Sequence, residues 1–233
     1  MGPIRLGRLP RTKRWDQVVE LIAAGAGVDE IAAASAQAAE TALRQASRDP
    51  SVGEAFWLLV NLPITARVPG FESALAGLDV HLDGQLSLFS LGAALVDAMD
   101  RRAMESGGRT DLGEMAGQAL LETLTASVEP DLPSLFTPEP ADVRSALGRL
   151  ASGDRFAGPA RQFYARLTGR VLDYYLSREL ADHVGPGRRF ETDDARRALD
   201  AALARHCTEA SRIVEAYAGG WYGKTVWQKG ALT

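Results

Sequence analysis

The sequence predicts an all-α protein, a multi-helix orthogonal bundle of about eight helices with no significant sheet. Apolar residues recur at steps of three and four in one segment after another, which is the spacing of one face of a helix. No segment alternates apolar and polar residues for long enough to predict a strand of a real sheet. Hydrophobic residues make up 46% of the 233 residues and charged residues 24%, which is ordinary for a folded protein and argues against wholesale disorder.

Glycine, proline and capping residues set the helix limits in the N-terminal half, residues 15–128. A helix that begins near Trp15 stops at Gly25, because glycine past a helix end favours termination. Pro63 limits a short buried helix, and Thr110 caps a later one. After the first helix we expect four more, over about 29–46, 55–60, 85–105 and 111–128.

A proline-rich segment, residues 129–140, is the best candidate boundary between two halves of the chain. It holds four prolines in twelve residues, which predicts a rigid linker or a bracing loop. The C-terminal half, residues 141–218, carries two long helices, over about 158–184 and from Thr192 onward. The apolar arc of the first is broad, which implies a central helix with several neighbours.

The last helix is expected to end at Gly219-Gly220, since a glycine pair is a common helix terminator. Its apolar residues predict one continuous buried stripe along its length. The members of that stripe are Leu199, Leu203, Cys207, Ala210, Val214 and Tyr217.

Composition excludes several classes of protein. The net charge of −4 excludes a uniformly basic nucleic-acid coat, although it leaves room for a local basic patch. The single cysteine, Cys207, cannot form an internal disulfide, and the N-terminus has no apolar run of signal-peptide length. No stretch of about 18 apolar residues indicates a membrane span. We therefore expect a cytoplasmic protein with no membrane partner, and the bias toward Ala, Arg and Gly favours a GC-rich bacterial genome.

No motif predicts a catalytic centre. Cys207 continues the apolar stripe of the last helix, so a buried core cysteine is its expected role. Its neighbour His206 points about 100° away around a helix and cannot act as its base without help from elsewhere. Asp79, His81 and Asp83 would share one face of an extended segment, but no second His or Cys cluster supports a metal site. The sequence thus names no catalytic residue, no metal ligand and no cofactor, and it leans against an enzyme.

The Gly185-Pro-Gly loop carries a candidate anion contact. Glycine motifs that cradle phosphates are absent from the chain. Arg188 and Arg189 could contact an anion together with the N-terminus of the following helix. The competing interpretation is that Gly-Pro-Gly only turns the chain and the two arginines only solubilise the loop, so the class of any small-molecule substrate stays unknown.

One segment, about residues 21–43, resembles a helix-turn-helix of the LuxR-like kind. An apolar helix ends in Ala24-Gly25, Glu30-Ile31-Ala32 begins the next helix, and Thr41 occupies an early position of the recognition helix. The resemblance implies DNA binding, with the basic arm upstream as a minor-groove or phosphate contact. An Ala-rich antiparallel helix pair with a glycine turn is the alternative interpretation.

Both ends of the chain carry side chains that are typical of interface anchors. The N-terminal arm, residues 1–14, is basic with interleaved apolar residues, and the tail, residues 219–233, is aromatic and basic without an acid. We expect such segments to order against another subunit or, for the tail, against the protein's own helices. The candidate contacts are Arg8, Arg11 and Arg14 in the arm and Trp221, Tyr222 and Trp227 in the tail.

These features favour two functions. The first is a non-enzymatic helical adaptor or structural subunit of a larger bacterial multi-protein assembly, which docks on other protein subunits through its arm and tail. The alternative is a small DNA-binding protein that uses the helix pair at residues 21–43 and the basic arm, so nucleic acid stays open as a partner. No family is recognised for the whole chain.

Overall fold

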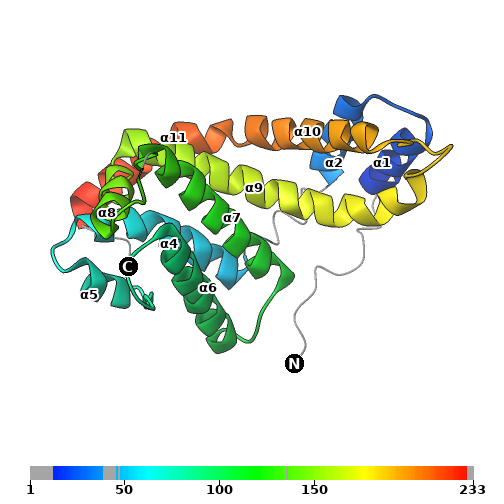
Figure 1. Ribbon diagram of the computed structural model, residues 1–233. Coiled ribbons are helices and arrows are strands. Elements are labelled where there is room, and N and C mark those ends of the chain that lie inside the picture. Colours follow the sequence, from blue (N-terminus) through cyan, green and yellow to red (C-terminus); the bar gives the residue numbers. More distant parts are fainter. Residues whose placement is uncertain (1–12, 39–45, 47, 135, 230–233) are drawn as a thin grey trace.

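The structure consists of helices (Figure 1), which confirms the all-α prediction. A computed structural model describes residues 13–38, 46, 48–134 and 136–229, with side chains through Lys224. Within these ranges it holds ten α-helices and no strand, apart from an isolated bridge between Val184 and Phe190. In chain order the helices are α1 (Lys13–Ala23), α2 (Val28–Ala38), α4 (Pro50–Arg67), α5 (Phe71–Ala76), α6 (Leu88–Glu105), α7 (Asp111–Val128), α8 (Pro140–Arg149), α9 (Gly153–Leu180), α10 (Asp193–Ala210) and α11 (Arg212–Lys229), with 3-10 turns at Glu129–Asp131 and Ala181–His183.

Helix α9 is the axis of the molecule. Its 28 residues make a helix about 42 Å long, since each residue adds about 1.5 Å. Figure 1 shows α10 and α11 following one another along α9, with α1 and α2 at one end and α4, α7 and α8 toward the other. Helices α2, α7, α10 and α11 all contact it. The broad apolar arc predicted a central helix with several neighbours, and this is confirmed.

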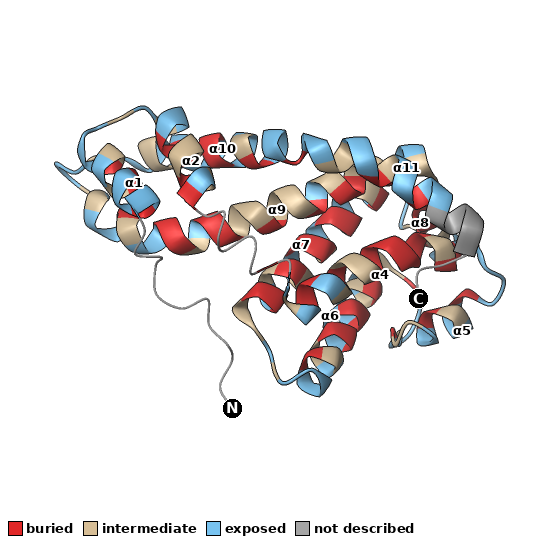
Figure 2. Cartoon of the chain, turned by 180° about the vertical axis from the view of Figure 1, so that it is seen from behind, coloured by how far each residue is buried: buried red, intermediate tan, exposed pale blue. Residues whose placement is uncertain are grey.

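One cluster of buried apolar side chains runs through both ends of the molecule, as the red segments of Figure 2 show. Helices from the two sides of residues 129–140 pack on one another, α7 on α9 and α4 on α8. Within that segment Asp131 accepts ion pairs from Arg149 at 3.2 Å and Arg155 at 3.3 Å. The two halves of the sequence therefore share a core.

Threonines cap two helices, as the sequence predicts. The Thr110 hydroxyl accepts a hydrogen bond from the Gly113 amide at 2.9 Å, and Thr192 accepts one from the Ala195 amide at 3.2 Å. Each hydroxyl satisfies an amide that has no partner within the first turn of its helix.

Helix α4 is longer than the sequence suggests, because it continues through Pro63 to Arg67. A proline inside a helix removes a hydrogen bond and costs about 3 kcal/mol or more. Eleven of the eighteen residues of α4 are buried, Pro63 among them. The tertiary packing around the helix outweighs this cost, so the expectation that Pro63 ends the helix is wrong.

Helix α11 runs straight through Gly219-Gly220, so the expected helix end there is also wrong. Gly219 lies against the first turn of α9. A methyl group added to Gly153 would lie 2.5 Å from the Gly219 carbonyl oxygen, and one added to Gly219 would lie 2.9 Å from the Gly153 carbonyl oxygen. The glycines therefore permit a backbone-to-backbone helix crossing that any side chain would block.

A break at Ser211 divides the predicted last helix into α10 and α11. The Ser211 hydroxyl donates to the Cys207 carbonyl oxygen at 2.7 Å, and its amide bonds the same oxygen. The break changes the register of the following turns. Val214 remains partly buried, but Tyr217 is 73% exposed and Ala210 is exposed as well. The single stripe predicted from Leu199 to Tyr217 is thus wrong at these two positions.

Candidate protein-docking surface

Helix α11 has an inner face that belongs to the core and an outer face that lies in solvent. The inner face presents Ala218 and Tyr222, both buried, at a spacing of four residues. The outer face presents Ile213, Tyr217 and Trp221 at the same spacing, exposed by 65%, 73% and 43%. Residues four apart lie one above the other on a helix, so these three side chains form a single stripe, which we call the outer stripe. Figure 2 shows exposed residues along the visible side of α11.

Tyr222 anchors the inner face. Its ring stacks on Phe156 of α9 with the ring centres 4.0 Å apart and the planes 13° from parallel. Its hydroxyl donates to the Val60 carbonyl oxygen of α4 at 3.2 Å. Burial raises the pKa of the phenol well above its ordinary value, so the ring stays neutral. The sequence placed Tyr222 among the partner contacts, but at 1% exposure it belongs to the protein's own core, and its role here is structural.

Trp221 lies at the border between the two faces. Its ring stacks on Phe56 of α4 with centres 6.4 Å apart, while almost half of the side chain stays in solvent. Phe56 in turn packs on Tyr164 of α9. The indole of Trp221 therefore lies on a pair of packed aromatic rings that fix its position. Trp221 is therefore both held by the fold and open to another molecule.

Small residues fill the gaps in the outer stripe. Ala216 and Gly220 are exposed and lie between its large members. The nearest acid on the helix, Glu215, is turned toward α9, where its Oε2 accepts from Arg161 at 2.6 Å. The outer face thus stays apolar between Arg212 and Lys224. Because Ala216 and Gly220 have small side chains or none, a second helix could approach this face closely.

The structure does not gather the six predicted contacts into one site. Arg8 and Arg11 and the side chain of Trp227 lie outside the described residues. Arg14 donates to the Gln37 carbonyl oxygen at 3.3 Å, at the α1–α2 end of the molecule. Trp221 belongs to α11, which lies toward the opposite end (Figure 1). Sequence reasoning missed Ile213 and Tyr217, because their exposure depends on the break at Ser211.

The candidate anion contact, Arg188 and Arg189, bonds to backbone carbonyls. Arg189 reaches across to the α1–α2 turn and donates to the Ala26 carbonyl oxygen at 2.6 Å. Arg188 donates to the Asp182 carbonyl oxygen within its own loop. The arginines therefore fasten the loop to its surroundings, and Arg189 joins it to a segment far away in the sequence.

The segment that resembles a helix-turn-helix forms α1, a glycine turn and α2. Gly25 has a φ of 75° in that turn, a conformation that glycine adopts without strain. Helix α2 packs on both α1 and α10, and Asp29 at its start pairs with Arg205 of α10 at 2.8 Å. Thr41 and the rest of residues 39–45, where the resemblance places the recognition helix, lie outside the described residues.

The ionisable residues weighed for metal chemistry make contacts within the protein. The Asp79 carboxylate accepts from Arg101 at 3.0 Å and lies 3.2 Å from His81 Nε2. The hydrogen bond from Arg101 lowers the pKa of Asp79. In the part of the chain that the structure describes, no three His, Cys, Asp or Glu side chains are grouped as metal ligands would be.

Cys207 is expected to resist thiol reagents in the folded protein. Its side chain is 2% exposed, and burial raises the pKa of the thiol to about 11. Because the thiolate is the reactive form, both effects slow the reaction. Mixed with 5,5′-dithiobis(2-nitrobenzoate) at pH 8, the native protein should release little thionitrobenzoate over minutes. In denaturing urea it should release one equivalent at once, and equally fast labelling of the native protein would contradict the burial.

Comparisons with known proteins found no matching protein-family model, no matching curated protein and no matching solved structure. Among the described helices, none combines the length and apolar character needed to cross a lipid bilayer. The function proposed below is therefore argued from the geometry of α11.

Proposed function

We propose that this protein is a non-enzymatic helical adaptor or structural subunit of a larger bacterial assembly, and that it docks on a partner protein through the outer stripe of α11. The observation that carries the proposal is the exposure of Ile213, Tyr217 and Trp221 along one helix face. Contiguous exposed apolar side chains on a soluble fold usually mark an interaction site. Aromatic residues in particular supply much of the binding energy at protein interfaces.

The size of the stripe limits what it can do alone. Burying a large apolar side chain completely is worth about 1.5–3 kcal/mol, and the three members of the stripe are already partly covered. Association costs roughly 4–15 kcal/mol in lost freedom. The stripe therefore needs further contacts for a stable complex, and we propose the basic arm with Arg8, Arg11 and Arg14 as a second attachment.

The partner element that fits the outer stripe best is an amphipathic helix. Ala216 and Gly220 leave room for close approach of a helix axis, and Tyr217 and Trp221 would flank it. A helix in this position would present its own apolar residues at steps of three and four. Binding at the outer stripe would be driven mainly by apolar burial and would depend little on salt, whereas the contact of the basic arm would weaken as salt rises.

The test is a pull-down from the native cells with the intact chain and the double variant Ile213→Glu/Tyr217→Glu. Both side chains are on the outer face, so we expect an unchanged thermal midpoint and loss of a stoichiometric partner. The matched control is Ala204→Glu/Thr208→Glu on α10, which introduces the same charges at the same spacing on exposed positions. The control should retain the partner. Retention by both variants, or no partner with any bait, would refute the proposal.

A further inference from the structure

A cavity of about 990 Å³ lies between the C-terminal end of α4, the short helix α5 and helix α8. It is separate from the outer stripe of α11, because none of the α11 residues whose side chains are described, 212–224, lines it. Its volume is at the upper end of the range found for small-molecule sites, about 300–1,000 Å³.

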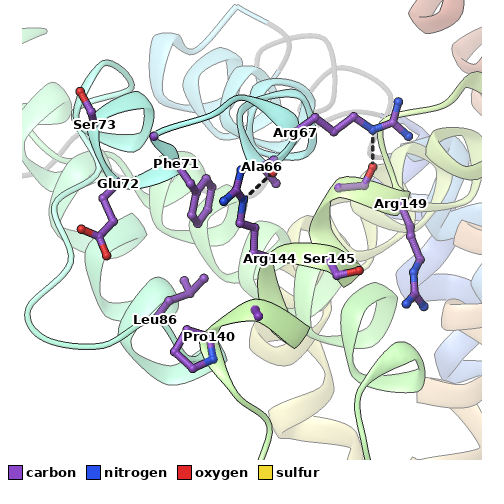
Figure 3. A pocket seen from close by; sticks show the side chains of 13 residues that line it. Ala66, Arg67, Phe71, Glu72, Ser73, Leu86, Pro140, Arg144, Ser145 and Arg149 are labelled. Carbon is purple, nitrogen blue, oxygen red and sulfur yellow. Dashed lines mark hydrogen bonds between the residues drawn. The ribbon is translucent and has the colours of Figure 1, made fainter.

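The lining has an apolar side and a cationic side (Figure 3). Phe71, Leu86 and Pro140 stand on one side, and Arg67 and Arg149 stand on the other, with Arg144 projecting between them. Phe71 and Leu86 are buried residues of the core, so the surrounding side chains hold the apolar side of the cavity in place. A mostly apolar hollow with a few placed polar groups is the usual character of a ligand site.

Two of these arginines are fixed in position by reciprocal hydrogen bonds between α4 and α8. Arg67 Nε donates to the Gly148 carbonyl oxygen of α8 at 2.7 Å. Arg144 of α8 donates from Nε to the Ala66 carbonyl oxygen at 2.9 Å and from a terminal nitrogen to the Val68 carbonyl oxygen at 2.8 Å. Each arginine thus caps the end of the other's helix. The hydrogen bonds hold both guanidinium groups in place before any ligand arrives.

The positive charge of the cavity is only partly compensated. Among the described residues, neither Arg67 nor Arg144 has a carboxylate partner, and Arg149 shares Asp131 with Arg155. Glu72 is the one acid on the described lining. A guanidinium carries five N–H donors, of which the carbonyls engage one on Arg67 and two on Arg144. In a chain with a net charge of −4, this is a local site of the opposite sign.

We propose that this cavity binds a small organic anion, a carboxylate or phosphate carried on an apolar or aromatic body. The anionic group would accept hydrogen bonds from the free N–H groups of Arg67 and Arg144, since guanidinium groups match both anions with paired donors. The apolar body would cover Phe71 and Leu86. This site is independent of the proposed docking surface, so either proposal can fail without the other.

Three probe compounds distinguish the contribution of the aromatic body to binding from that of the anionic group. 1-Naphthyl phosphate has both the aromatic body and the anion, 1-naphthol has only the body, and inorganic phosphate has only the anion. Titrations of the full-length protein are followed by NMR through the Leu86 methyl groups. We expect 1-naphthyl phosphate to bind at least ten-fold more tightly than either fragment and to shift the Leu86 signals.

Variants locate the binding. Arg67→Gln and Arg144→Gln should each weaken the binding of 1-naphthyl phosphate about ten-fold, and Arg197→Gln, at an exposed position on α10, should leave it unchanged. Because loss of a helix cap could disturb the fold, a second variant, Ser145→Trp, fills the cavity from an exposed lining position and keeps both arginines. It should abolish binding. Absence of a Leu86 shift, equal affinity for naphthol, or unaltered binding by Ser145→Trp would each overturn the proposal.

Discussion

Replacing Tyr222 by alanine is expected to lower the free energy of unfolding by about 3–5 kcal/mol, the usual cost of deleting a buried aromatic ring. The ring joins three helices, because it lies on α11, stacks on Phe156 of α9 and donates to the Val60 carbonyl oxygen of α4. Alanine would leave a cavity at their meeting point and would remove the hydrogen bond to the Val60 carbonyl oxygen. Urea unfolding followed by far-ultraviolet circular dichroism measures the change.

The control for this experiment is Tyr217→Ala, the same substitution five positions earlier on the same helix. Tyr217 is 73% exposed, so its loss should change the unfolding free energy by no more than about 0.5 kcal/mol. Tyr222→Phe removes only the hydroxyl and should cost about 1 kcal/mol. Similar losses for the two alanine variants would mean that α11 is not docked as the structure places it.

The second large effect is expected at the helix crossing of α9 and α11. Gly219→Ala puts a methyl group 2.9 Å from the Gly153 carbonyl oxygen, a distance at which backbone must move. Gly220→Ala meets no atom within 4 Å. Alanine is the better helix former by about 0.5–1 kcal/mol at both positions, so the comparison of the two variants cancels that term. Overpacking then makes Gly219→Ala less stable than Gly220→Ala by about 1–3 kcal/mol.

Thermal unfolding can measure the difference in stability between Gly219→Ala and Gly220→Ala. For a protein of about this size, each kcal/mol shifts the midpoint by roughly 2–4 °C. Gly220→Ala should unfold at or above the midpoint of the parent protein, and Gly219→Ala should unfold below it. Equal midpoints would show that the two helices do not cross at Gly153.

The parts of the fold that could be predicted from the sequence are those set by local chemistry. Thr110 and Thr192 cap helices because a threonine at a helix start satisfies free amides of the first turn, whatever lies elsewhere. The broad apolar arc of α9 is also a local signal. It indicates a central position because so wide an apolar surface needs several neighbouring helices to cover it. These predictions did not require knowledge of any distant residue.

The predictions that failed depend on distant residues. A glycine pair that ends a helix and one that allows a close crossing have the same local pattern, and only Gly153 on another helix distinguishes them. Pro63 is tolerated because several other helices pack on α4. The sequence predicts a buried helix here, but it does not show that these distant helices offset the cost of the proline. The faces of α11 are set by the break at Ser211, so the sequence alone could not tell that Tyr222 is buried and Tyr217 exposed.

The candidate cavity was missed for a similar reason. Arg67 and Arg144 are far apart in the sequence and each looks like an ordinary surface arginine. Their reciprocal hydrogen bonds exist only where the ends of α4 and α8 meet. No local motif signals that arrangement.

The central claim is that one face of α11 belongs to the core and the other binds a partner protein. Site-specific photo-crosslinking in the native cells tests it most directly, with p-benzoylphenylalanine at position 217 and, as control, at the exposed position 197 of α10. The account predicts one defined adduct with a partner protein from position 217 that position 197 does not give. No adduct from position 217, or the same adducts from both positions, would contradict it.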